Sequence, residues 1–356
     1  MIIDNHVHVF PDQGGSAGYA DVHSQLDRLQ GSVGRFWGRM LTSHDDPKFI
    51  PEPNEEVGFY VGKFGRYHWT KFGEECWLQR GPVALERMEH TADQMIAQMD
   101  FVGVDKAVIL SDYVEPNFGR QTYFTDAINR YPDRLIGSVA IQYDLQNSTE
   151  YLLSEINKLT HAVEVSGFRA LHRHLPKGQP LDDKRCDALW KEVVRLGIPV
   201  YMDTGFNSKT DYMDEIQRIE NVLRNYPELI AIDCHLGANV RHPTDPEFVE
   251  NPKEFFKLFK LGRFHLEVGY VLAYENWGVW GQDYEYPYPR HAEIIRQAYE
   301  NFGPQVLVWG SDMPWTMRTC TYQQNLDLIR LHTDYMSEQD RSLILGGNIA
   351  KAFGIT

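Results

Sequence analysis

The chain has 356 residues, of which 42% are hydrophobic, and its formal net charge is −15. This acidity argues against nucleic acid or an anionic membrane as a partner. No run of about 18 apolar residues occurs, so no membrane-spanning helix is predicted.

The N-terminus and the cysteines give two further expectations. The N-terminus has no basic segment followed by an apolar one, so we expect no signal peptide. Cys76, Cys186, Cys234 and Cys320 are widely separated, which is typical of reduced thiols in a cytoplasmic protein.

The first predicted element is a buried strand over residues 2–10, IIDNHVHVF. Side chains alternate along a strand, so His6 and His8 lie on one side together with Asp4 and can bind one metal ion. Two histidines satisfied within a core are the alternative interpretation of this segment.

An insertion of about residues 11–84 follows, and it is rich in aromatic residues, at positions 36, 37, 59, 60, 64, 67, 69, 72 and 77. If the first strand belongs to a barrel, the insertion leaves it at the catalytic end, so we predict an active-site lid. A satellite core or a subunit interface is the alternative. Either role would supply an apolar wall suited to a planar substrate.

From residue 89 onward, helices and strands alternate. Helices are predicted near 89–103, 120–131, 149–164, 187–197, 212–226, 251–262 and 290–303, and strands at 104–110, 134–142, 166–175, 198–203, 229–235, 263–269 and 305–312. The strands are continuous apolar runs, which is typical of a parallel sheet covered by helices. With the first strand they indicate an α/β fold, a single-domain (β/α)8 TIM barrel over residues 1–356. A doubly wound open sheet is the alternative, but the Gly-rich phosphate turn that it needs is missing from the sequence.

Polar side chains stand at the C-terminal ends of six of the eight predicted strands, where TIM barrels carry their chemistry. They are His6, His8, His172, His174, Asp203, His235, Glu267 and Asp312. Capping or core hydrogen bonds explain one or two such residues, whereas the whole set indicates one shared site. Imidazole and carboxylate ligands without cysteine suit Zn, Mn or Fe(II) in a catalytic site.

The sequence resembles the amidohydrolase superfamily, and within it the amidohydrolase-2 group that includes aminocarboxymuconate-semialdehyde decarboxylase. The matching motifs are IIDNHVHVF, MIAQMDFVGVDKAVIL, CHLGAN, GSDMPW and ILGGNIAKAFGI, in the family's order along almost the whole chain outside the insertion. The resemblance implies an enzyme with one divalent metal ion, Zn or Mn, and a small-molecule substrate. It also implies a homo-oligomer, commonly a dimer.

Ligands follow from the resemblance residue by residue. It implies that His6 and His8 are first-strand metal ligands and that Asp312 is the last-strand ligand or proton carrier. The fourth-strand ligand is His174 or His172, and the leading Gly of GFRALHRH favours His174.

The resemblance also implies residues that act on the substrate. His235 would polarise the substrate or orient the attacking water. Asp203 stands where many members have a histidine, which argues for a single metal ion. Glu267 could contact substrate or pair with an arginine, and Trp315 and Arg318 at the barrel mouth are further substrate-binding candidates.

Two reactions fit these residues. In hydrolysis, which we predict first, Asp312 takes a proton from a metal-activated water that attacks a small carboxylated cyclic or aromatic compound. In non-oxidative decarboxylation of an aromatic or muconate-type acid, Asp312 or His235 protonates the ring carbon as CO2 leaves. A metal-free lactonase and a non-catalytic binding barrel are further alternatives.

Overall fold

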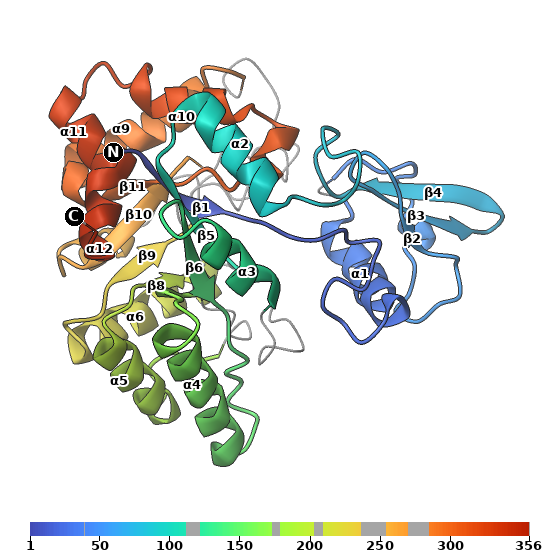
Figure 1. The fold of residues 1–356 in the computed structure, drawn as a ribbon, viewed down its shortest axis with the longest axis horizontal. Helices are drawn as coiled ribbons and strands as arrows, with labels where there is room; N and C mark the ends of the chain where they lie inside the picture. Colours follow the sequence, from blue (N-terminus) through green and yellow to red (C-terminus); the bar gives the residue numbers. More distant parts are fainter. Residues whose placement is uncertain are drawn as a thin grey trace.

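The barrel is evident in the computed structural model, which describes residues 1–38, 40–111, 122–172, 179–202, 209–235, 254–269 and 285–355. Eight parallel strands follow one another in one sheet, in the order β1-β5-β6-β7-β8-β9-β10-β11. They are β1 (Ile3–Val7), β5 (Lys106–Ile109), β6 (Leu135–Val139), β7 (Ala170–His172), β8 (Val200–Met202), β9 (Ala231–Asp233), β10 (Phe264–Val268) and β11 (Leu307–Trp309). Backbone bonds from His8 to Met313 (2.6 Å) and from Asp312 to His6 (2.8 Å) join the first strand to the segment after the last. The predicted TIM barrel is confirmed (Figure 1).

Helices alternate with the strands of the described chain. Those before the last strand overlap the helices that the alternating pattern predicts, whereas the three after it were not predicted. These helices are α2 (Ala92–Val102), α3 (Thr122–Arg130), α4 (Thr149–Glu164), α5 (Asp187–Leu196), α6 (Lys209–Asn225), α7 (Phe255–Phe259), α9 (Pro289–Phe302), α10 (Tyr322–Arg330), α11 (Glu338–Ser342) and α12 (Asn348–Ala352). Local sequence sets their ends: α2 starts at a capping box between Thr91 and Gln94 and stops at Gly103, which has φ 80°. Among the described residues, no helix is both long and apolar enough to cross a membrane. All four cysteines are buried, and none forms a disulfide.

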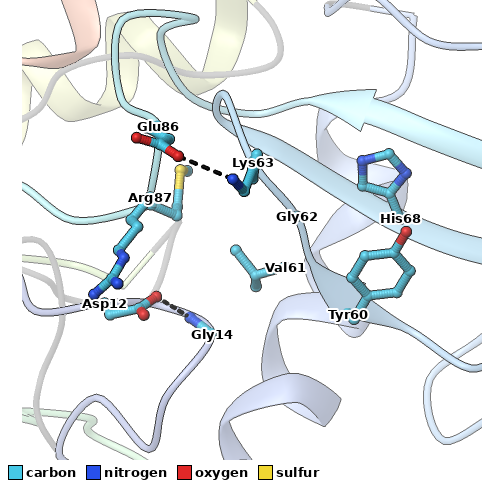
Figure 2. Close-up of a pocket in the computed structure, with 10 residues that line it drawn as sticks. Asp12, Gly14, Tyr60, Val61, Gly62, Lys63, His68, Glu86 and Arg87 are labelled. Atoms are coloured by element: carbon cyan, nitrogen blue, oxygen red, sulfur yellow. Dashed lines mark hydrogen bonds and ion pairs between the residues drawn. The ribbon is translucent and has the colours of Figure 1, made fainter.

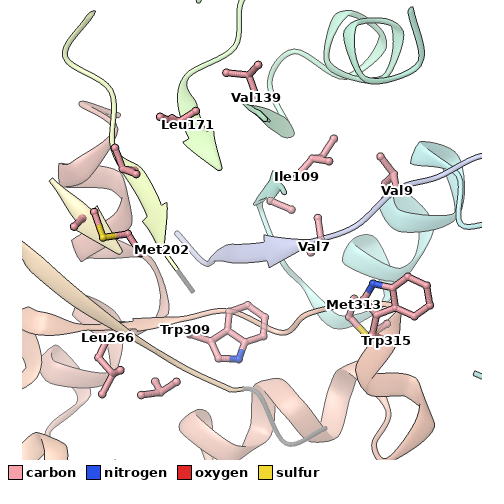
Figure 3. Close-up of a cluster of buried hydrophobic side chains, with 14 of the residues drawn as sticks. Val7, Val9, Ile109, Val139, Leu171, Met202, Leu266, Trp309, Met313 and Trp315 are labelled. Carbon is pink, nitrogen blue, oxygen red and sulfur yellow. The ribbon is translucent and has the colours of Figure 1, made fainter. Parts of the chain in front are cut away.

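Alternate side chains of the strands enter two buried layers. The outer layer packs against the helices and includes Val7, Ile109, Val139, Leu171, Met202, Leu266 and Trp309 (Figure 3). The inner layer takes Ile3, Val108, Ile136, Ala170, Tyr201, Ile232 and Val308 from seven of these strands, and α12 packs against it. Strand β10 differs, because the residues that alternate with its outer Leu266 are His265 and Glu267.

Buried histidines will steepen the loss of stability in acid. Burial lowers the pKa of His265 to about 4 and that of His291, on α9, to about 3, from an ordinary value of 6.5. Below pH 6.5 the unfolded chain therefore binds more protons than the native state, and the free energy of unfolding falls as the pH falls. Each histidine contributes on the order of 3 kcal/mol to this fall by about pH 4.

We expect His291→Gln to reduce the difference in unfolding free energy between pH 7 and about pH 4.5, measured by urea denaturation. His23→Gln is the matched control, because the side chain of His23 is 86% exposed. Equal pH dependence in the two variants would contradict the prediction.

The insertion forms a module beyond the C-terminal end of β1, to one side of the barrel (Figure 1). It contains α1 (Val22–Phe36) and an antiparallel sheet of β2 (Tyr60–Val61), β3 (Arg66–Lys71) and β4 (Glu74–Gln79). Phe10 and His90 exchange backbone hydrogen bonds of 2.8 and 2.9 Å, so the module closes at residue 90.

Aromatic side chains of the insertion pack mainly on one another. Trp69 is 1% exposed, stacks with Phe59 and lies tilted against Trp37, and it donates its indole N–H to the Phe49 carbonyl. These residues belong to the same buried cluster as the outer layer of the barrel. The roles of the insertion as a lid, a satellite core or a subunit interface remain predictions.

Candidate metal centre

Three predicted ligands converge at the mouth of the barrel. The Nε2 atoms of His6 and His8 lie 2.9 Å apart, and Asp312 Oδ1 lies 2.8 Å from His8 Nε2 and 3.4 Å from His6 Nε2. All three residues are less than 5% exposed. The structure thus brings together side chains that are about 300 positions apart in the chain, with a separation of 304 between His8 and Asp312.

The hydrogen-bond partners of the two rings decide which ring atoms carry protons. His8 Nδ1 lies 2.9 Å from the Leu110 carbonyl, which can only accept, so Nδ1–H is the donor. His6 Nδ1 likewise donates to the carboxylate of Glu267, at 2.9 and 3.1 Å. In the neutral rings both Nε2 atoms therefore present lone pairs toward each other and toward Asp312. Three electron-pair donors at such distances fit a shared cation, and imidazole with carboxylate suits Zn or Mn.

The electrostatics favour an ionised Asp312. Burial by itself would raise the pKa of this carboxyl group, but the positive charge that His6 and His8 carry when their rings are protonated outweighs burial and holds the pKa below the ordinary value of 3.8. An anionic carboxylate is the form that can bind a metal ion or accept a proton.

Glu267 lies beneath His6 and is fully buried. Besides His6, it accepts hydrogen bonds from the Asn5 side chain (3.1 Å) and from the backbone N–H of His235 (3.3 Å). Tyr201 of β8 donates to Asn5 at 2.6 Å, which extends the network across the inside of the barrel. Carboxylates in this arrangement fix the tautomer and orientation of a ligating histidine. The sequence indicated Glu267 as a site residue but did not reveal its partners Asn5 and Tyr201.

His235 follows β9 and lies beside His6, with the ring centroids 5.1 Å apart. Its φ is 65° and that of Asp312 is 56°, so both strand-end residues adopt the left-handed conformation. Non-glycine residues in this region occur at functional sites when the surrounding contacts hold them there. Among the described residues, His6, His235 and Glu267 form a second group with metal-ligand spacing. We favour the first group, because the Glu267 oxygens already accept three N–H groups.

Asp4 is the one first-strand residue that leaves the predicted face. Its carboxylate accepts hydrogen bonds from Ser311 and from Tyr322 of α10, while Asn5 and His6 both reach Glu267. The strand register shifts between Asp4 and Val7, which breaks the strict alternation that the prediction assumed. The prediction that Asp4 shares the face of His6 and His8 is therefore wrong. Burial raises the pKa of Asp4 to about 6, against the lowering effect of the Ser311 hydrogen bonds.

Only one of the two candidates for the fourth-strand ligand lies among the described residues. His172, at the end of β7, is 6% exposed and its Nδ1 donates to the Ser111 carbonyl at 2.8 Å, just as His8 Nδ1 donates to Leu110. His172 belongs to neither ligand group among the described residues. His174 and Asp203 lie outside the described residues, so the choice between His172 and His174 stays open.

Trp315 and Arg318 join the insertion module to the barrel mouth. Trp315 stacks on Phe10 at 5.1 Å, and its ring centroid lies 6.3 Å from that of His8. The guanidinium of Arg80 lies 4.2 Å from the Trp315 ring and 4.3 Å from the Phe36 ring. Arg318 Nη1 donates to the Arg80 carbonyl at 2.6 Å. The sequence analysis did not identify Arg80, which directly follows β4 and has no motif around it.

A cavity of about 530 Å³ lies within the insertion and not at the metal-ligand group (Figure 2). Tyr60 and His68 stack at 5.0 Å on one side of it, and Lys63 pairs with Glu86 at 2.9 Å. Its charged lining residues are of both signs, so it shows no convergent charge comparable to the His6–His8–Asp312 group.

A barrel of eight parallel strands, with histidines and acids at its mouth, defines the class of the fold as a (β/α)8 TIM barrel. The model of the amidohydrolase family matches residues 3–355, and the chain belongs to this family. A comparison with curated proteins found no match to the chain.

Solved structures of several amidohydrolase-like proteins share the fold. A zinc-bound amidohydrolase from Burkholderia multivorans has 12% identity and a TM-score of 0.64, with 100% of each chain covered. A probable 2-pyrone-4,6-dicarboxylic acid hydrolase from Acinetobacter baumannii has 17% identity and a TM-score of 0.56, with 99% of each chain covered. A manganese-bound dihydroxybenzoic acid decarboxylase from Polaromonas sp. JS666 has 15% identity and a TM-score of 0.53, covering 75% of this chain and 87% of that one. At these identities the likeness is one of fold.

Proposed function

We propose that the chain is a metal-dependent hydrolase acting on a small carboxylated cyclic or aromatic compound. The observation that carries the proposal is the convergence of His6 Nε2, His8 Nε2 and Asp312 Oδ1, with the Nδ1–H group of each histidine engaged elsewhere. These three residues would hold one Zn or Mn ion, and His172 or His174 would complete the ligand set. One structure with the same fold is a probable hydrolase of a pyrone dicarboxylic acid, which is a small carboxylated cyclic compound and supports the proposed substrate class.

A divalent ion bound there would act as a Lewis acid and lower the pKa of a bound water toward about 7. Asp312 would accept a proton during attack and return it to the leaving group. His235, next to His6, would donate a hydrogen bond to the negative charge that develops on the substrate. Glu267 would keep the Nε2 of His6 directed at the ion.

Substrate contacts would come from the junction of insertion and barrel. Trp315 would form an apolar wall beside His8, and the guanidinium of Arg318 is the proposed carboxylate contact at the mouth.

Non-oxidative decarboxylation of an aromatic acid is the second candidate. The same residues would bind the acid, and Asp312 or His235 would protonate the ring carbon that loses CO2. A decarboxylase of dihydroxybenzoic acid among the fold relatives favours keeping this candidate.

Metal analysis and a substrate panel test the proposal together. We expect close to one equivalent of Zn or Mn by elemental analysis, and metal-dependent hydrolysis of carboxylated lactones or pyrones. Hydroxybenzoates and carboxymuconate-like acids are assayed in parallel for CO2 release. Turnover with CO2 release alone would replace hydrolysis by decarboxylation, and activity in a fully metal-free protein would favour a metal-free lactonase.

A further inference from the structure

The carboxylate of Asp4 lies between the two chain segments that supply the proposed ligands. It is fully buried and accepts four hydrogen bonds: from the backbone N–H of His6 (3.1 Å) and of Ser311 (2.9 Å), and from the hydroxyls of Ser311 (2.5 Å) and Tyr322 (2.8 Å). None of these contacts reaches the ligand atoms themselves. Asp4 therefore touches the backbone of one ligand, His6, and the neighbour of another, Asp312.

Asp312 needs such support because its backbone is left-handed, with φ 56°. A conformation of this kind costs of order 1–3 kcal/mol in a non-glycine residue unless its neighbours enforce it. The residues on both sides are fixed through one hydroxyl: Ser311 Oγ donates to Asp4 and accepts from the Met313 N–H at 3.1 Å. Asp312 itself donates its N–H to the His6 carbonyl at 2.8 Å.

We infer that Asp4 is a positioning residue that, through Ser311, holds Asp312 in the left-handed turn that directs its carboxylate at His8. The inference rests on the proposed metal-dependent function, since the arrangement it preserves is the ligand set of that site. Asp4 acts through hydrogen bonds and does not bind the ion. Substitution of Asp4 should therefore raise the dissociation constant for the metal ion. A buried carboxylate far from the site should change only the stability of the metal-free protein when it is substituted.

The first test is the zinc affinity of Asp4→Asn, measured by competition with a chromophoric chelator. We expect the dissociation constant for zinc to rise about tenfold to a hundredfold, the range found for residues that orient metal ligands. The matched control is Glu155→Gln, because Glu155 is also a buried carboxylate that accepts a backbone N–H, from Gln142 at 2.7 Å, but lies on α4. Glu155→Gln should lower the melting temperature of the metal-free protein and leave the zinc affinity unchanged.

Coupling distinguishes positioning from a general loss of stability. Ser311→Ala should weaken zinc binding by itself, and adding it to Asp4→Asn should weaken binding little further, because both remove the same support. Tyr322→Phe removes one hydroxyl from Asp4 and keeps the packing against Trp309, so it supplies a milder variant if Asp4→Asn does not fold.

The possible outcomes separate the two proposals. Wild-type zinc affinity in the folded Asp4→Asn variant, or in both Ser311→Ala and Tyr322→Phe if it does not fold, would overturn the inference and leave the proposed function standing. A wild-type protein that binds no zinc or manganese would overturn the proposed function and the inference with it.

Discussion

Asp312→Asn is expected to lower kcat/KM by at least about a thousandfold on whichever substrate the panel identifies, equivalent to about 4 kcal/mol of transition-state stabilisation. The substitution preserves the shape of the side chain and removes its charge. It therefore removes both an anionic ligand atom, 2.8 Å from His8 Nε2, and the proposed proton acceptor. The fold should persist, because the backbone bonds of Asp312 to His6 and Thr316 do not involve the side chain.

Metal titration distinguishes the two roles of Asp312. If it served only as a ligand, excess zinc would restore turnover of Asp312→Asn. We expect no restoration at saturating zinc, because no group replaces the proton carrier. Asp327→Asn on α10 is the control, as it also changes a buried acid, and it should retain activity. Activity of Asp312→Asn close to that of wild type would remove this residue from the mechanism.

Glu267→Gln is expected to weaken zinc binding about tenfold to a hundredfold and to reduce turnover at limiting metal. The carboxylate of Glu267 accepts N–H groups from Asn5, His6 and the His235 backbone. A glutamine must place its own NH2 group against at least one of these donors, so either the His6 ring or the turn at His235 loses its support.

The measurement is zinc affinity together with kcat/KM at limiting and saturating zinc. Recovery of most activity at saturating zinc would show that Glu267 acts through His6. A loss confined to KM, with unchanged zinc affinity, would instead make Glu267 a substrate contact. Glu215→Gln on α6 is the control, because Glu215 is a carboxylate that is 1% exposed and lies on an outer helix.

Much of the fold could be predicted from local sequence. All eight predicted strands are present, and each observed strand lies within its predicted range. Apolar runs such as AVIL at 107–110 predict buried parallel strands because both faces of a barrel strand pack against apolar groups. The end of the insertion was less well predicted, because the pairing of Phe10 with His90 that closes it joins segments far apart in the chain.

The candidate site divides in the same way. His6 and His8 could be predicted from their spacing, and Asp312 from the motif GSDMPW. The register shift that turns Asp4 away from His6 and His8 could not be predicted, because strict alternation is the default for any strand. The shift accompanies hydrogen bonds from Ser311 and Tyr322 to Asp4, which join distant parts of the chain. Arg80 was missed because its position between two rings depends on packing between the insertion and the barrel.

The sequence by itself determined the strand-helix order, the apolar layers and the kinds of side chain at the strand ends, because each of these depends on periodicity and residue type. Only the tertiary structure decided which side chains meet. The pairing of His6 with Glu267 spans 261 positions, and that of His8 with Asp312 spans 304. Such contacts form when the barrel closes, and with them the tautomers of the histidines and the direction of the ligand atoms are set.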